Sequence, residues 1–243
     1  MLILLAFSLM IFVSCEVSND MNPITSNSSK PIFFLLFEVN MNNGVKMVDV
    51  EFCTNNVTII PTVTINRDTL KTTIDFNNGT IRGELHDLHY SKVYNYTITA
   101  NRKKTSGNIT MPTRPQNVKC NGIPLNDTQL NILTDSDSVK FSWTCDSYDY
   151  FSYKWESDYS HIKEATTKNT HFSFSRDGSV YYKLHLLAIE GPRLVPGVGP
   201  NVSGDYGDGY VQGLSEELEY NILISGGEMM RDNQNNSQTV QSE

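Results

Sequence analysis

Apolar and polar residues alternate along much of this chain with a period of two. The alternation is clearest over residues 94–100, where Tyr94, Tyr96, Ile98 and Ala100 are separated by polar residues. A period of two places every second side chain on the same side of the backbone, and it is typical of a strand with one buried face. No convincing helical period accompanies it. We therefore predict an all-β protein.

Short strands follow one another closely in the first half of the chain. Seven are predicted between residues 31 and 112, beginning with the continuous apolar run that follows Pro31. In the second strand, Val48, Val50 and Phe52 are expected to face inward. Many short strands at this spacing are typical of a β-sandwich.

The same pattern begins again after a proline-containing linker at residues 112–115. Val139, Phe141 and Trp143 repeat the inward set of the first copy, and alternate residues of the segment 182–188 repeat the Tyr94 set. The repeat predicts a second domain, which we place at residues 113–212. The remainder, 213–243, is acidic and then rich in Asn and Gln, and most of it is predicted to be a tail, with LEYNILI at residues 218–224 as a possible further edge strand.

Two stretches of the sequence resemble fibronectin type III domains. Leu88 precedes Tyr94 by six residues, as at the corner between strands E and F of that family, and MPTRPQNVKC followed by VKFSWTC is similar to a junction between tandem copies. The resemblance implies two tandem fibronectin type III-like, immunoglobulin-like β-sandwiches over 31–112 and 113–212. It also implies that the Tyr94 hydroxyl bonds to the preceding corner.

The N-terminus carries an apolar run at residues 2–13 that is too short to span a membrane but suits a signal peptide. We expect a signal peptide at 1–15 and a flexible leader at 16–30. A bacterial lipoprotein signal, with Cys15 as the lipidated residue, is the alternative. No later apolar run approaches membrane-spanning length, so we predict a secreted protein without stable membrane insertion.

Eight Asn-x-Ser/Thr sequons agree with export, since they are acceptors for N-linked glycans in the secretory pathway. The acceptor residues are Asn27, Asn56, Asn78, Asn95, Asn108, Asn126, Asn201 and Asn235. The net charge of -8 argues against a nucleic-acid partner, which would require clustered Lys and Arg.

Three cysteines follow the predicted signal peptide. Cys120 lies near the end of the first predicted strand of the second domain, and Cys145 lies just after the second. We predict that they form a disulfide across these neighbouring strands, because exported proteins meet oxidising conditions. Cys53 is expected to be unpaired in the monomer and to face outward beside Phe52. A disulfide to another molecule remains an alternative for this thiol.

Nothing in the sequence argues for catalysis. His86 and His89 are close, but they lack partners at a spacing that would define a metal site. No nucleophile, phosphate-binding or metalloprotease motif occurs. We therefore expect no enzyme activity, cofactor or metal. The rival hypothesis is a secreted carbohydrate-active or metal-dependent enzyme, which would require a pocket with converging polar groups.

Two stretches are candidates for contact with a partner. Aromatic residues crowd the segment 148–159. Strand alternation predicts that Phe151, Tyr153 and Trp155 fill the core beneath Trp143. The remaining tyrosines are expected to lie on flanking loops and to face a partner, and these are Tyr148, Tyr150 and Tyr159.

The second candidate is the basic cluster Arg102, Lys103 and Lys104 on a predicted hairpin. A solvated loop and a contact to glycosaminoglycan or an acidic protein are both open. From these features we predict a secreted, glycosylated, non-enzymatic binding or adhesion protein that contacts an extracellular protein or glycan through sandwich loops. One alternative is a soluble decoy resembling a cytokine-receptor ectodomain, although this chain lacks the Trp-Ser-x-Trp-Ser motif of that family. Another is a pathogen or parasite surface antigen.

Overall fold

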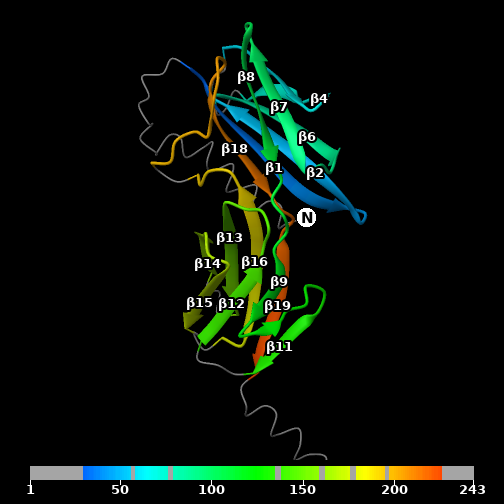
Figure 1. Cartoon of the computed structure of the whole chain (residues 1–243), viewed down its shortest axis with the longest axis vertical. Helices are drawn as coiled ribbons and strands as arrows, with labels where there is room; N and C mark the ends of the chain where they lie inside the picture. Colours follow the sequence, from blue (N-terminus) through cyan, green and yellow to red (C-terminus); the bar gives the residue numbers. More distant parts are fainter. Residues whose placement is uncertain are drawn as a thin grey trace, which may run out of the picture. The chain divides into compact units, whose positions relative to one another are not determined.

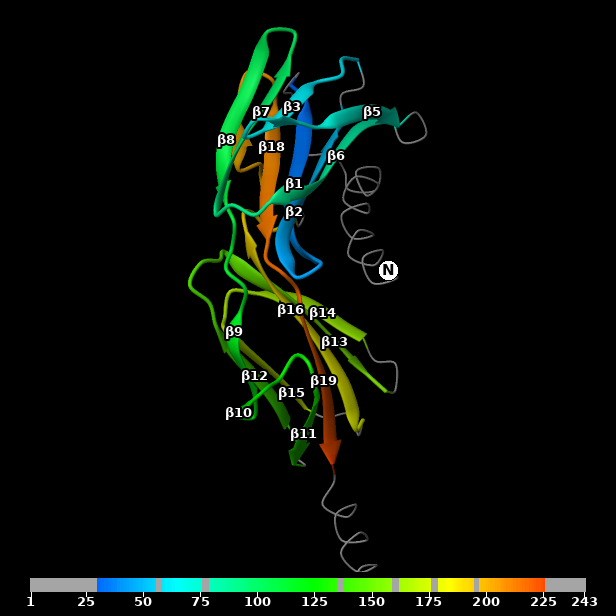
Figure 2. The same ribbon diagram turned by 90° about the vertical axis from the view of Figure 1, so that its right-hand side faces the viewer.

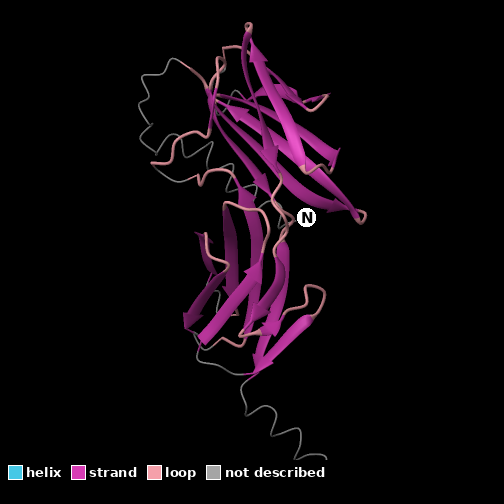
Figure 3. Cartoon of the chain, in the orientation of Figure 1, coloured by secondary structure: helices cyan, strands magenta, loops and turns pink. Residues whose placement is uncertain are grey.

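All regular structure in the described part of the chain is β-strand. The computed structural model describes residues 30–55, 58–75, 79–134, 138–158, 162–175, 179–194 and 197–225. Within them no helix occurs, and strands account for every regular element (Figure 3). The all-β prediction is confirmed. The expected signal peptide and nearly all of the expected leader lie outside the described residues.

The chain divides into two compact units, each built from two separate stretches. Unit 1 comprises Met1–Pro112 with Glu190–Leu214, and unit 2 comprises Thr113–Ile189 with Ser215–Glu243. The backbone therefore passes from one unit to the other three times.

Unit 1 is a sandwich of two sheets (Figures 1 and 2). Its strands are β1 (Ile32–Asn42), β2 (Val45–Thr54), β3 (Thr62–Ile65), β4 (Asp68–Thr69), β5 (Lys71–Asp75), β6 (Thr80–His89), β7 (Val93–Ala100), β8 (Lys103–Thr110), β17 (Val202–Ser203) and β18 (Asp208–Leu214). One sheet has the order β17-β18-β1-β2-β6-β5, and the other has the order β4-β3-β7-β8.

The core of unit 1 is filled by alternate residues of both sheets. Val48, Val50 and Phe52 are at most 2% exposed, so the predicted inward set of β2 is confirmed. Tyr96 and Ile98 on β7 are buried against them. Burying each large apolar side chain contributes about 1.5–3 kcal/mol to folding.

The corner before β7 is held by Tyr94. Its ring is 1% exposed, and its hydroxyl donates a hydrogen bond to the carbonyl of His89 at 2.9 Å. The same oxygen accepts a hydrogen bond from the Ser91 N–H at 2.8 Å. The predicted corner is confirmed, and it follows directly on β6, which ends at His89. Burial raises the pKa of the Tyr94 hydroxyl.

The stretch Glu190–Leu214 completes unit 1 rather than unit 2. Its strand β18 pairs in parallel with β1, with Phe33 opposite Gly209. A Cβ atom at Gly209 would lie 2.3 Å from the Phe33 ring, so only glycine allows this approach. Tyr206 and Val211 enter the core of unit 1.

Unit 2 is a second sandwich. Its strands are β9 (Gln116–Cys120), β10 (Ile123–Pro124), β11 (Leu130–Thr134), β12 (Ser138–Thr144), β13 (Tyr150–Ser157), β14 (Ile162–Thr167), β15 (His171–Ser175), β16 (Tyr181–Glu190) and β19 (Leu218–Ser225). One sheet has the order β10-β9-β12-β15, and the other has the order β11-β19-β16-β13-β14.

Aromatic side chains fill the core of unit 2. Trp143 packs edge-on against Phe151, with ring centroids 5.1 Å apart. Trp155 on β13 stacks on Phe174 of β15 in the opposite sheet, with centroids 4.3 Å apart. The inward sets predicted for β12 and β16 are confirmed, because each of their residues is at most 4% exposed. These residues are Val139, Phe141 and Trp143 on β12 and Tyr182, Leu184, Leu186 and Ala188 on β16.

The predicted start of the tail at residue 213 is wrong, whereas the alternative that residues 218–224 add a strand is confirmed. The strand β19 pairs with β16 and buries four side chains in the core, namely Leu218, Tyr220, Ile222 and Ile224. Glycine and proline crowd the preceding stretch, which suggested that the second domain ends there. That stretch instead belongs to unit 1, and the chain then returns to unit 2.

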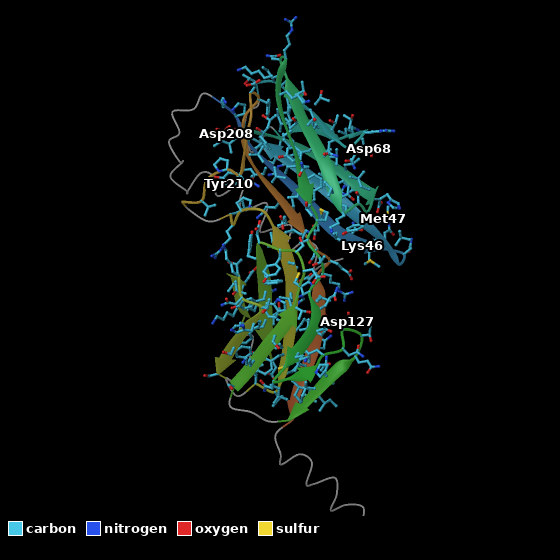
Figure 4. The ribbon with its side chains drawn as sticks, in the orientation of Figure 1. Lys46, Met47, Asp68, Asp127, Asp208 and Tyr210 are labelled. Carbon is cyan, nitrogen blue, oxygen red and sulfur yellow. The ribbon has the colours of Figure 1, made fainter. Side chains whose placement is uncertain are left out.

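The start of β19 is also tied down by polar contacts. Arg114 forms ion pairs with Asp127, which is labelled in Figure 4, and with Glu216 at 3.2 Å. Ser215 closes the end of β16, because its N–H donates to the Ala188 carbonyl and its hydroxyl accepts from the Ala188 N–H.

We predict that Tyr94→Phe lowers the free energy of unfolding of unit 1 by about 1 kcal/mol or more, because the Ser91 N–H and the His89 carbonyl both lose a partner. Thermal unfolding followed by circular dichroism, with amide exchange at Ser91, measures this. Tyr90→Phe is the matched control, since within the described residues the Tyr90 hydroxyl makes no hydrogen bond. An unchanged melting temperature in the Tyr94 variant would contradict the stabilising role of the corner.

A chain ending at Gly213 is expected to lose the fold of unit 2, whereas a chain ending at Ser225 keeps it. Losing the buried side chains of β19 costs about 2–5 kcal/mol each, which together exceeds the stability of a typical domain. Both tryptophans lie in the core of unit 2, so tryptophan fluorescence reports this unit alone. A native emission spectrum from the shorter chain would show that β19 is dispensable.

Candidate interaction surfaces

The three predicted contact tyrosines do not form a common exposed surface. Tyr150 is the first residue of β13 and is only 4% exposed, so its prediction as a partner-facing loop residue is wrong. The segment turns into a strand earlier than expected. Tyr148 is half-buried, with its ring 4.2 Å from that of Phe151. Tyr159 lies outside the described residues.

The aromatics of β13 instead hold the two sheets of unit 2 together. Tyr153 stacks on Phe172 of β15, with ring centroids 4.0 Å apart and planes at 5°. Phe151 is fully buried and Trp155 is 7% exposed, so their predicted place in the core is confirmed. The density of aromatic residues in this segment therefore reflects packing.

The basic cluster lies on an exposed hairpin turn. Asn101 and Arg102 both have positive φ angles, of 47° and 65°, as a two-residue turn that matches the twist of the strands requires. Arg102, Lys103 and Lys104 are exposed, and among the described residues none of the three forms an ion pair. Their cationic charge is therefore available to an anionic partner.

The predicted disulfide between Cys120 and Cys145 is absent, and both thiols are free. Cys120 lies opposite Phe141, whereas Cys145 follows the far end of β12. Four residues of strand span about 13 Å, while a disulfide requires Cα atoms within about 7 Å. The thiol of Cys145 instead donates to the Thr113 carbonyl at 3.2 Å.

Cys53 was expected to be unpaired in the monomer, and this is also wrong, because it is disulfide-bonded. Its outward position on β2 agrees with the alternation of that strand, where Phe52 is buried and Cys53 is half-exposed.

His86 and His89 point to different partners. The His86 ring lies 3.3 Å from a Glu84 carboxylate oxygen and 3.6 Å from one of Asp49. Although desolvation opposes it, these carboxylates raise the pKa of His86. His89 bonds to the Tyr90 carbonyl. Among the described residues, no group of three His, Cys, Asp or Glu side chains is arranged to hold a metal ion.

Four of the eight predicted glycan acceptors lie in the described residues. Asn95, Asn108 and Asn126 are exposed. Asn201 differs, because its amide donates to the Val211 carbonyl and accepts from the Val211 N–H, and so continues the pairing of β17 with β18. Asn27, Asn56, Asn78 and Asn235 lie outside the described residues.

An apolar surface that the sequence did not reveal lies on unit 2. Leu130 is 50% exposed and Ile132 is 61% exposed on the edge strand β11. Ile132 lies beside Leu223 of β19, and Leu223 lies beside Tyr181 of β16. These four side chains form a row of half-exposed apolar groups across three strands, which we term the β11 patch.

The orientation of β11 is fixed by a buried asparagine. Asn131 is 9% exposed, and its amide donates to the carbonyls of Asn126 at 2.8 Å and Asn221 at 3.0 Å, while it accepts from the Asn126 N–H at 2.7 Å. Because strand side chains alternate, an inward Asn131 forces Leu130 and Ile132 outward. Leu133, which is 3% exposed, shares the inward side of β11 with Asn131.

The charged groups beside the β11 patch neutralise one another. Lys183 pairs with Glu219 at 2.9 Å, and this contact raises the pKa of Lys183 and lowers that of Glu219. Lys154 also forms an ion pair with Glu156, at 2.5 Å. The surroundings therefore present no large net charge to a partner.

No helix in the described residues has the length and hydropathy to cross a membrane.

Comparison with known proteins adds little to the strand topology. No known protein family and no curated protein matches the sequence. Domains A168–A170 of titin align with 79% of this chain and 61% of their own length, at 10% identity and a TM-score of 0.24. The Yersinia pseudotuberculosis adhesin InvE aligns with 80% of this chain and 58% of its own, at 10% identity and a TM-score of 0.25. The chain thus spans about three fifths of both.

The two free thiols are expected to differ in reactivity. Burial raises the pKa of Cys120 to about 12, and its side chain is fully buried. Since the thiolate is the reactive form, iodoacetamide should modify the half-exposed Cys145 at least about tenfold faster in the native protein. Unfolding should equalise the two rates. Equal native rates, or a peptide linking the two residues, would contradict the assignment.

Proposed function

We propose that this chain is an exported, glycosylated, non-enzymatic binding protein that docks an extracellular protein on the β11 patch. The observation that carries the proposal is the outward placement of Leu130 and Ile132, which are 50% and 61% exposed next to Leu223 and Tyr181. Contiguous exposed apolar side chains on a folded domain mark interaction sites.

The chemistry of the β11 patch favours a protein over a glycan. Leu130, Ile132 and Leu223 are aliphatic and offer no hydrogen bond, so they gain free energy by leaving water against another apolar surface. The position on a sheet edge adds backbone groups that a partner strand can pair with. Export is supported by the apolar run at residues 2–13 and by the sequons.

The edge strand itself lacks the usual guards against association. Edge strands are commonly blunted by Lys, Pro or inward-pointing charges. The segment Leu130–Thr134 contains none of these residues. Its short length limits non-specific pairing, and it confines a partner to a small, defined site.

The test is a binding measurement against a panel of purified receptor and matrix ectodomains. The double variant Leu130→Asp with Ile132→Asp is expected to lose at least about tenfold in affinity for the bound ectodomain, which corresponds to about 1.4 kcal/mol. Both side chains are half-exposed, so the fold should be retained.

Ile162→Asp is the matched control. Ile162 is 62% exposed on β14, at the opposite edge of the same sheet, and it should leave the affinity unchanged. Equal affinities for the double variant and the wild type would refute the β11 patch. If replacing Arg102, Lys103 and Lys104 abolished binding instead, the contact would lie on the basic hairpin.

A further inference from the structure

Two of the predicted glycan acceptors face each other on neighbouring strands of unit 1. Asn95 on β7 lies directly opposite Asn108 on β8. Both are exposed, because the flanking Tyr94, Tyr96 and Ile109 turn inward. Directly opposed residues of an antiparallel pair have Cβ atoms about 4.5–5.5 Å apart.

The surrounding face is rich in hydroxyl groups. The rows across β3, β7 and β8 align Thr64 with Thr97 and Ser106, and Thr62 with Thr99 and Lys104. Hydroxyl groups both donate and accept hydrogen bonds, as sugars do. Such a face has little apolar area to offer a protein partner, but it can hydrogen-bond to a carbohydrate that lies along it.

Both acceptor amides are available for modification. Within the described residues, neither the Asn95 nor the Asn108 side chain is held by a hydrogen bond, in contrast to that of Asn201. The backbone of Asn95 is fixed by Asn66, whose side chain accepts from the Asn95 N–H at 3.0 Å and whose N–H donates to the Asn95 carbonyl at 2.7 Å. The Asn95 amide is thus presented outward from a fixed backbone.

We propose that Asn95 and Asn108 form a paired glycan acceptor that carries one N-linked glycan per folded molecule, seated on the hydroxyl-rich face of β3, β7 and β8. This inference rests on the proposed export. A diphosphate-linked oligosaccharide is the donor: the bond from the sugar C1 to the asparagine amide nitrogen forms, the C1–O bond to the diphosphate breaks, and the amide loses one proton.

The limit of one glycan follows from the spacing. Two branched chains rooted on opposed residues compete for the same surface, so the second must stand away from the face and lose conformational freedom. A chain that receives both sugars before folding therefore forms the β7–β8 hairpin less favourably. The secreted, folded protein should be depleted of such molecules.

The number of glycans on the pair can be counted directly, because the sequence around Asn95 and Asn108 contains no aspartate. The segment Asp87–Asn126 contains no internal aspartate, so cleavage before aspartate releases both asparagines on one peptide, whereas trypsin separates them at Arg102. The full chain with Asn126→Gln, expressed in glycosylating secretory cells, should yield this peptide with one glycan. Removing either asparagine of the pair should raise the occupancy of the other toward completion.

Asn126 in the unsubstituted chain serves as the internal control, because it is exposed on a turn of unit 2 and is not paired across strands with another acceptor. If Asn126 carries sugar while the paired peptide carries two glycans or none, the paired acceptor is refuted and the proposed export stands. If the chain is not secreted and no sequon carries sugar, the proposed export fails, and the paired acceptor fails with it.

Discussion

The antiparallel pairing of β16 with β19 is the constraint on which unit 2 depends. Leu186 lies opposite Leu218 at the start of this ladder, yet residues 187–217 separate them and include the whole stretch that completes unit 1. Closing such a loop is tolerable, because the entropic cost grows only slowly with loop length. Ser215 and the Arg114 ion pairs hold the returning chain where β19 begins.

The features that could be predicted from sequence are those set by local alternation. In β2, β7, β12 and β16 the apolar residues recur at every second position, and all four predicted inward sets are at the cores of the two units. The Tyr94 corner was also predictable, because its hydroxyl bonds to residues only three and five positions away. Local patterns of this kind need no knowledge of the partner sheet.

The features that could not be predicted depend on distant partners. β18 and β11 form parallel ladders with β1 and β19, and no pattern in a single segment specifies such pairings. The inward placement of Asn131 on β11 depends on hydrogen-bond partners of its amide in the turn and on β19. The disulfide predicted between Cys120 and Cys145 is wrong because the antiparallel register of β9 and β12 places the two cysteines at opposite ends of this ladder. That register cannot be seen in either strand alone.

The outer surfaces of the two units carry different chemistry on the same kind of scaffold. In unit 1, the face of β3, β7 and β8 presents threonine, serine and asparagine, because every apolar residue of these alternating strands except Val93 is turned into the core. In unit 2, the inward Asn131 leaves leucine and isoleucine outside. Asn131, with its hydrogen bonds satisfied, and the buried Leu133 share the inward side of β11, and the apolar residues between them therefore lie on the outer surface. The proposed binding role of unit 2 and the proposed carbohydrate cover of unit 1 both depend on which side of each strand faces water.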